Sequence, residues 1–508
     1  MTRPKTGRWT AKLAFRVLRS AFILFIGAHA IMQTGCGARR TPDLARIFAD
    51  ARQSKGKRPI IVIPGILGSQ LVNRRTGEMV WPSAFLSSDD GLSLPTTPDL
   101  QANRDELSAA KILETARLAR LIPADVYVYY ELLRALREYG GYREGDWNAP
   151  APDGDRDTFY VFAYDWRRDN VETARELTRR VEELKRKLGR PELRFNVVAH
   201  SMGGLVARYA AMYGDNDLPE GDTSPQPTWA GASSISKVFM FGTPNEGSAE
   251  AFATLLEGYS ITEGLRRRVR LLNKLTREDA LTIPSIYQLL PHPDAANFLD
   301  ENLQPLEVDL YDPSVWKRYG WAAVNDPRYR ERYARGETRD EDARPHRNGS
   351  LEELDAYFAT ALRRARRFHQ ALDAHRGDAP ANANAASPVT MFVFGGDCEE
   401  TLTAPVIRRD AKKGTWETYT NPRAFRRSDG QRVSRKQATE AMYEPGDGRV
   451  TRRSLLGERL ARERASMLFN TSLPIAYAVF TCDLHSDLQK NKTLQDNALT
   501  LLVNEMMR

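Results

Sequence analysis

Six short runs of almost continuously apolar residues recur along the chain and alternate with longer helical patterns. The runs are PIIVIPG at 59–65, TFYVFAYD at 158–165, LRFNVVA at 193–199, SKVFMFGTP at 236–244, VTMFVFGG at 389–396 and IAYAVFTC at 475–482. Strands that helices cover on both faces of a parallel sheet have this character. The alternation therefore predicts one α/β domain with a mostly parallel, doubly wound sheet.

Helical patterns and two long interruptions fill the spaces between these runs. Asp169 directly precedes NVETARELTRRVEELKRKLG, after the second run, and Glu172 follows three residues later, the spacing of a capping box. Residues 66–123 and 245–388 break the rhythm, and both leave from the carboxyl ends of predicted strands. Because α/β sheets bind ligands at that edge, we predict that both insertions form cap or lid material within a domain of residues 58–508.

The N-terminus has the features of an export signal. Basic residues precede a short apolar run, SAFILFIGAHAIMQTGC, which is too short for a spanning helix of about 20 residues. Its last four residues, QTGC, resemble a bacterial lipobox that would lipidate Cys36. A plain signal peptide or an uncleaved anchor are the alternatives. We therefore predict an export signal at 1–36, a polar tether at 37–57 and a location in the bacterial cell envelope or outside the cell.

Composition excludes several classes of protein. The 508 residues are 41% apolar and 28% charged, as in globular proteins, with a net charge of +8. Basic residues are interspersed with acidic ones, as in RRVEELKRKLGR, and no zinc-ligand spacing, phosphate-binding loop or basic tract with aromatic residues appears. We expect no metal, no cofactor and no nucleic-acid partner. Cys398 and Cys482 each follow a predicted strand, so they either form a disulfide or are two separate buried thiols.

One serine has the setting of a catalytic nucleophile. Ser201 lies in NVVAHSMGGLVARY, between a predicted strand and a predicted helix. A sharp strand-to-helix turn raises such a side chain above the sheet and needs small residues two positions before and after it, here Ala199 and Gly203. The alternative is a glycine-containing turn with an incidental serine.

A serine hydroxyl needs a general base, and His485 is the best candidate among the seven histidines. In this architecture the base follows the serine in the chain, which excludes His29 and His200. His485 lies directly after the last predicted strand, where a loop can reach back over the sheet. The other four lie in the second insertion: His292, His346, His369 and His375.

The acid that orients the histidine and the donors that stabilise an oxyanion complete the predicted site. Asp447, in a turn between Gly446 and Gly448, is the favoured acid, and Asp397, at the end of FVFGGD, is the alternative. The backbone N–H of Met202 accompanies the serine turn, and that of Ile66, in the loop PGILGSQL, is the second candidate donor. A plain glycine turn is the alternative for that loop.

Several motifs together resemble the lecithin:cholesterol acyltransferase-like family, which includes phospholipid:diacylglycerol acyltransferases and lysosomal phospholipase A2. They are PIIVIPGILGSQL, AYDWR, AHSMGG, GTPNEGS, PSIYQLLP, GDGRV and CDLHSDL. The resemblance implies an α/β-hydrolase fold with Ser201, Asp447 and His485 as its triad. It also implies that Trp81 lines the acyl region, with a packed core position as the alternative. Asp165 and Arg167 of AYDWR are expected to brace the core.

The sequence thus predicts an exported serine acyl hydrolase or acyltransferase that acts on lipid esters at a membrane surface. Water or a lipid alcohol would accept the acyl group from an acyl-enzyme. A general carboxylesterase or triacylglycerol lipase is one alternative. A catalytically silent hydrolase-fold protein that binds lipid or serves as an envelope scaffold is the other.

Overall fold

The structure, a computed structural model of the whole chain, describes most of the residues after position 40. The described residues are 41–82, 91–119, 122–219, 221, 223–260, 273–336, 349–374, 388–410, 413–458 and 473–506. The chain divides into two compact units, Met1–Asp43 and Leu44–Arg508, and every element below belongs to the second. Cys36 and the predicted export signal lie outside the described residues. Among the helices that can be described, none has the length and apolar character needed to cross a membrane.

A seven-stranded sheet in which every neighbouring pair is parallel forms the centre of the unit. Its order is β20 (Ile475–Thr481), β13 (Thr390–Gly396), β10 (Ile235–Phe241), β9 (Phe195–His200), β1 (Ile60–Ile63), β8 (Thr158–Val161) and β7 (Arg143–Glu144). All six predicted strands are present, which confirms the predicted doubly wound sheet. The two-residue β7 is too short to leave an apolar pattern in the sequence.

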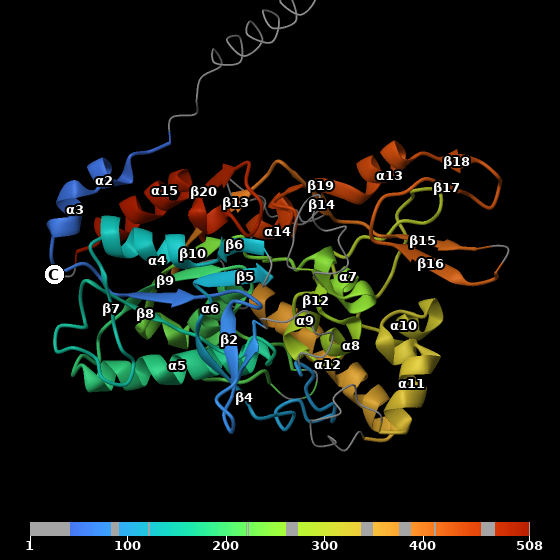
Figure 1. The fold of residues 1–508 in the computed structure, drawn as a ribbon, viewed down its shortest axis with the longest axis horizontal. Helices are drawn as coiled ribbons and strands as arrows, with labels where there is room; N and C mark the ends of the chain where they lie inside the picture. Colours follow the sequence, from blue (N-terminus) through green and yellow to red (C-terminus); the bar gives the residue numbers. More distant parts are fainter. Residues whose placement is uncertain are drawn as a thin grey trace, which may run out of the picture. The chain divides into compact units, whose positions relative to one another are not determined.

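Alternate strand residues face opposite layers of helices. Ile60 and Val62 pack into one hydrophobic cluster with α4 (Tyr130–Arg134), η2 (Ala135–Tyr139) and α15 (Lys492–Val503). Ile61 and Ile63 pack into the other cluster with α5 (Asn170–Lys187) and α6 (Met202–Tyr213). Figure 1 shows α4 and α15 on one side of the sheet and α5 and α6 on the other. Full burial of each such side chain contributes roughly 1.5–3 kcal/mol, which explains the continuously apolar runs.

Helix α5 begins at the predicted residue, but its cap has only half of the predicted form. The Asp169 carboxylate accepts hydrogen bonds from the N–H groups of Val171 and Glu172, at 2.9 and 3.0 Å. The Glu172 side chain does not complete a capping box, because it pairs with Arg168 at 2.8 Å instead. The two N-cap bonds satisfy two otherwise unpaired donors of the first turn, and the Asn170 N–H donates to the Gln288 side chain at 2.7 Å.

The two predicted insertions contain different kinds of element. The first holds a three-stranded sheet and a hairpin, made of β2 (Ser69–Asn73), β3 (Met79–Trp81), β4 (Leu107–Ile112), β5 (Thr115–Ala119) and β6 (Ile122–Tyr127). The second is mostly helical, with α7 (Ala249–Glu257), β11 (Tyr259–Ser260), β12 (Asn273–Leu275), α8 (Arg277–Leu281), α9 (Pro284–Tyr287), α10 (Pro313–Tyr319), η6 (Ala323–Asn325), α11 (Pro327–Ala334) and α12 (Leu351–Asp373). Buried residues of α12, such as Leu354 and Phe358, belong to the same cluster as α5 and α6. The second insertion therefore shares the main core.

Two regions differ from the prediction. Residues 44–53, predicted as part of the tether, form α2 (Leu44–Ile47) and α3 (Ala49–Gln53), because Leu44 and Phe48, one helical turn apart, bury in the cluster with α4. A third insertion, not predicted, separates β13 from α14 (Arg452–Leu456). It contains β14 (Glu399–Leu402), β15 (Val406–Arg409), β16 (Trp416–Tyr419), β17 (Phe425–Arg426), β18 (Arg432–Val433), α13 (Arg435–Met442) and β19 (Tyr443–Gly446). The short helices η3 (Ala230–Ser233) and η7 (Leu488–Lys490) lie elsewhere, in loops.

Candidate active site

Ser201 occupies a sharp turn between β9 and α6. Its φ of 53° and ψ of −128° lie in a region that residues other than glycine rarely adopt, and such strain is concentrated at functional sites. The Ser201 N–H donates to the carbonyl of Phe241 at 2.7 Å, which fixes the turn against β10. A Cβ at Gly203 would lie 2.5 Å from the carbonyl oxygen of Pro64, so this position needs the small residue that the sequence predicted.

His485 joins the serine to an acid. Its Nε2 lies 2.9 Å from Ser201 Oγ, and its Nδ1 lies 2.8 Å from Oδ2 of Asp447. A carboxylate only accepts hydrogen bonds, so Nδ1 carries the proton and Nε2 is left to accept from the serine hydroxyl. The residues are 7%, 9% and 1% exposed in the order Ser201, His485 and Asp447, so little water competes for these bonds.

The turn after β19 orients the Asp447 carboxylate. Oδ1 accepts from the backbone N–H groups of Arg449 and Val450, at 3.0 and 2.7 Å, which leaves Oδ2 to face the histidine. The Asp447 carbonyl accepts from the N–H of His485 at 2.8 Å, so the two loops are also joined through the backbone. Of the two candidate acids, the structure brings Asp447 to His485, whereas the Asp397 carboxylate lies 3.5 Å from the sulfur of Cys398.

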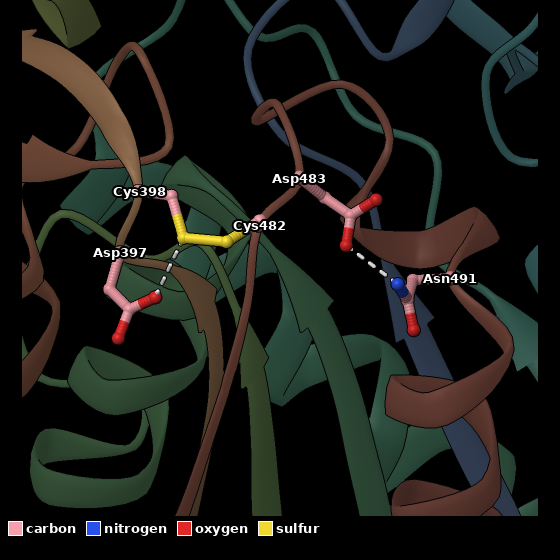
Figure 2. Close-up of a disulfide and its surroundings, with 5 residues drawn as sticks. All are labelled: Asp397, Cys398, Cys482, Asp483 and Asn491. Atoms are coloured by element: carbon pink, nitrogen blue, oxygen red, sulfur yellow. Dashed lines mark hydrogen bonds between the residues drawn. A yellow bond between two sulfur atoms is a disulfide. The ribbon is translucent and has the colours of Figure 1, made fainter. Parts of the chain in front are cut away.

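A disulfide fixes the start of the loop that carries His485. Cys398 and Cys482 are bonded, with their Cα atoms 5.0 Å apart, as one of the two interpretations of the sequence predicted. Figure 2 shows that the next residue, Asp483, points the other way and accepts from the side chain of Asn491, at 2.6 Å. Asn491 in turn caps α15. The loop between Cys482 and Asn491 is therefore held at both ends.

The loop after β1 lies directly against the serine. A Cβ at Gly65 would stand 2.8 Å from Cβ of Ser201, a contact too close for any other residue. Within the described part of the chain, the backbone N–H groups of Ile66 and Met202 donate to no protein acceptor. Two such free donors beside a nucleophile can stabilise an oxyanion.

Trp81 and Arg167 serve the framework around this loop. Trp81 is completely buried, packs edge-on against Trp166 and donates from Nε1 to the Leu67 carbonyl at 2.9 Å. Trp81 therefore has the packed core position that the sequence offered as the alternative to lining the acyl region. Its bond to Leu67 supports the loop that carries Ile66. Arg167 is also fully buried and is bonded to Asp165 and Asp105, as expected for a brace of the core.

A second histidine, His200, links the loop after β1 to the loop that carries His485. His200 was excluded as the base by its place in the chain, and its connection with Tyr129 was not predicted. The Gly65 N–H donates to the Tyr129 hydroxyl at 2.8 Å, and that oxygen lies 2.9 Å from Nδ1 of His200. Nε2 of His200 lies 3.2 Å from the carbonyl oxygen of His485. These hydrogen bonds form a continuous series when the Tyr129 hydroxyl donates to Nδ1 of His200 and Nε2 of His200 donates to the His485 carbonyl.

His200 must be neutral for this arrangement, since Nδ1 accepts a hydrogen bond. Burial, reinforced by the nearby His485, lowers the pKa of His200 to about 3, and the bond to the His485 carbonyl opposes this only in part. Burial also raises the pKa of the Tyr129 hydroxyl, which therefore keeps its proton. His200 thus stays an uncharged link between two loops at neutral pH. The position of His200 directly before Ser201, on the same turn, was the only feature of the sequence that could have indicated this role.

A parallel sheet with serine on a strand-to-helix turn, followed along the chain by an aspartate and a histidine on later loops, defines the α/β-hydrolase class. Within that class, residues 96–334 match the family model of lecithin:cholesterol acyltransferase. The match confirms the resemblance inferred from the motifs over a segment that includes Ser201, while Asp447 and His485 lie beyond it. It supports a lipid ester hydrolase or acyltransferase.

Solved structures show the same fold. The chain is similar to a chain in the crystal structure of the Tle4–Tli4 complex, with a TM-score of 0.50, 15% identity and coverage of 88% of this chain and 98% of that chain. EstA from Clostridium botulinum is a weaker likeness, with a TM-score of 0.30, 13% identity and coverage of 89% of each chain. At these identities the first likeness shows the fold alone, and the second adds nothing to it. No curated protein matches the chain.

Proposed function

We propose that the protein is a serine-dependent acyl hydrolase or O-acyltransferase that acts on lipid esters. The observation that carries the proposal is the continuous chain from Asp447 through His485 to Ser201, with bonds of 2.8 and 2.9 Å. A serine at a strained turn, a base within hydrogen-bond reach and a buried acid behind it are the parts that acyl transfer requires. The family match supports lipids as the class of substrate.

In the proposed reaction, Ser201 Oγ attacks the ester carbonyl while Nε2 of His485 takes its proton. Asp447 holds the imidazole in the required tautomer and stabilises the cation that forms. The N–H groups of Ile66 and Met202 would receive the oxyanion of the tetrahedral intermediate. His485 then returns the proton to the departing alcohol, which leaves the acyl group on the serine. These steps need neither a metal nor a cofactor.

The acceptor distinguishes hydrolysis from transfer. Water would release a fatty acid from the acyl-enzyme, and a lipid alcohol would form a new ester through the same proton transfers in reverse. Purified protein would therefore be given phospholipid vesicles with and without a sterol or diacylglycerol, and the products separated. Ser201→Ala should lose activity by on the order of 10⁴-fold or more, and a variant that keeps full activity would refute the mechanism.

Two alternatives share the fold. A general carboxylesterase or triacylglycerol lipase would turn over short-chain or neutral esters and leave phospholipid vesicles intact. A silent lipid-binding scaffold would not react with a fluorophosphonate, although melting experiments show it to be folded. The proposal requires labelling of the wild-type protein that Ser201→Ala abolishes.

We also propose that the protein is exported and attached to the membrane through lipid on Cys36. The proposal rests on the basic start, the short apolar run and the sequence QTGC. Cells grown with a radioactive fatty acid should contain labelled protein, and Cys36→Ala should remove the label. An unlabelled mature wild-type protein would favour a cleaved signal peptide.

A further inference from the structure

The third insertion carries a local excess of positive charge, although residues 41–508 as a whole have no net charge. We call residues 406–442, which contain β15 to β18 and α13, the basic arm. The basic arm has ten Lys and Arg residues against four Asp and Glu, a net charge of +6, whereas the whole chain has +8. The long helices mix acidic and basic residues, but this segment is predominantly basic.

Most of these charges lie on the surface. The exposed basic residues are Arg409, Lys413, Arg423, Arg426, Arg432, Arg435 and Lys436, and the exposed acidic ones are Asp429 and Glu440. The arm's few apolar side chains, including Val406, Tyr419 and Phe425, form a small cluster with residues of α7. The arm is thus anchored on α7 of the second insertion by its apolar face and presents a positive face to solvent.

Two of the arginines stand where they repel each other. Arg426 of β17 and Arg432 of β18 are direct partners in the antiparallel ladder, and the Arg426 guanidinium donates to the Gly430 carbonyl at 3.3 Å. Like charges at opposite positions destabilise a strand pair. By contrast, Arg408 in the neighbouring ribbon lies opposite Glu417 and bonds to it at 2.9 Å, which is the arrangement that stability favours.

The next element of the arm repeats this conflict. Helix α13 begins with Arg435 and Lys436, and its first turn contains no acidic residue. Cations are unfavourable at this end, because the helix dipole places partial positive charge there. Two neighbouring elements of the arm therefore hold positive charge against their own stability, which fits a surface that binds anions.

The arm is directly connected to the candidate site. β19 leads out of the arm and pairs with β14, and Asp447 follows Gly446, the last residue of β19. Figure 1 shows the orange elements of the arm beyond β14 and β19, on the side of the sheet away from β7. A ligand held by the arm would therefore be bound by the segment that continues, through β19, into the loop of Asp447.

We propose that the basic arm docks the protein onto the phosphate groups of an anionic phospholipid surface and so presents the active site to lipid. This rests on the proposed function for its choice of partner. Nucleic acid fits less well, because single strands bind on exposed aromatic faces. In the described part of the arm, Tyr419 and Phe425 are buried and Trp416 packs edge-on against Tyr319.

The test uses sedimentation with vesicles of phosphatidylcholine alone or of phosphatidylcholine and phosphatidylglycerol in equal parts. Ser201→Ala protein is used throughout, so that no lipid is consumed and binding is measured independently of the proposed chemistry. We expect binding to the anionic vesicles alone, with an affinity that falls as salt is raised. Binding that is equal on both vesicles, or absent from both, refutes the arm's role.

Arm and control variants with the same charge change locate the effect. Replacing Arg426, Arg432, Arg435 and Lys436 by Gln should weaken anionic-vesicle binding by about fivefold for each charge that lies near the surface. The matched control replaces four exposed bases of α5, Arg179, Arg180, Arg186 and Lys187, by Gln and should bind as the parent does. Equal losses in both variants would mean that net charge alone decides binding.

Two further measurements separate the remaining outcomes. With Ser201 restored, the arm variant should hydrolyse a soluble short-chain ester at the parental rate, which shows that it is folded and that its site is intact. If no variant or parent cleaves any ester but anionic-vesicle binding is still lost with the arm, the proposed function fails and the docking surface stands. Binding of duplex DNA without binding of anionic vesicles would overturn the docking proposal.

Discussion

The basic arm leads into the loop of Asp447 in the candidate active site, but the arm and the site are opposite in character. Ser201, His485 and Asp447 are buried, and each polar group has a partner that orients it. The arm exposes charges that oppose each other, as Arg426 and Arg432 do across one ladder. The comparison suggests a division of labour, in which the site performs the chemistry on any ester and the arm selects the surface. Substitutions in the site should therefore lower the turnover of a soluble ester, whereas substitutions in the arm should lower binding to anionic vesicles.

The largest expected effect belongs to the site. Asp447→Asn should lower kcat/KM for a soluble ester by about 10³- to 10⁴-fold, which is about 4–5 kcal/mol of barrier, because an amide no longer fixes the tautomer of His485. Asp397→Asn is the matched control and should change the rate little, since Asp397 lies beside the disulfide. The assignment of the acid would be wrong if the two variants exchanged these effects.

The disulfide at the base of the arm should matter for stability rather than for chemistry. Cys398 and Cys482 are 84 residues apart, so their bond closes a loop that contains the whole arm and Asp447. Replacing both by Ser should lower the free energy of unfolding by about 3–5 kcal/mol in urea titrations. Turnover of the soluble ester in the absence of denaturant should stay near the wild-type rate. A large loss of turnover in fully folded protein would show that the bond also positions His485.

His200 should make the site region sensitive to acid. Its folded pKa of about 3 lies below that of the unfolded chain, about 6.5. As pH falls below 6.5, the unfolded state therefore binds a proton that the folded state does not, and stability decreases. Between pH 6.5 and 5 the expected loss is about 1.6 kcal/mol.

The control for this prediction is His200→Gln, which keeps an acceptor for Tyr129 and a donor for the His485 carbonyl but does not titrate in this range. Urea unfolding at both pH values should show the loss in the wild-type protein and a correspondingly smaller loss in the variant. Identical pH dependence in the two proteins would mean that His200 is already protonated, or accessible to protons, in the folded state.

The sequence predicted most of the site and the sheet because each depends on short local patterns. The six buried strands leave apolar runs, and Ser201 and His485 follow from chain order and from the turn around the serine. The sequence favoured Asp447 over Asp397 because of its glycine-flanked turn and its place in the chain, and the structure places the Asp447 carboxylate 2.8 Å from Nδ1 of His485. The bond between Tyr129 and His200 joins residues 71 positions apart and leaves no pattern.

The arm escaped prediction for a related reason. Its strands β17 and β18 have two residues each, too few to show a period of two, and its apolar residues bury against α7 rather than against one another alone. Its charge is evident in the sequence, but the charges were interpreted from the long helices, where acids accompany the bases. Only the ladder shows that Arg426 meets Arg432 instead of an acid.

The smallest expected effect has the opposite sign to the others. Arg432→Thr removes the repulsion with Arg426 and places a residue that favours strands, so it should raise the free energy of unfolding by about 0.2–1 kcal/mol at low salt. The gain should shrink as salt screens the charges. Arg409→Thr is the control, because Arg409 lies opposite Trp416 and not opposite a cation. If Arg432→Thr stabilises the protein and weakens its binding to anionic vesicles, the arm sacrifices stability for docking. If it destabilises the protein, the two arginines do not repel each other and the physical basis of the docking proposal is lost.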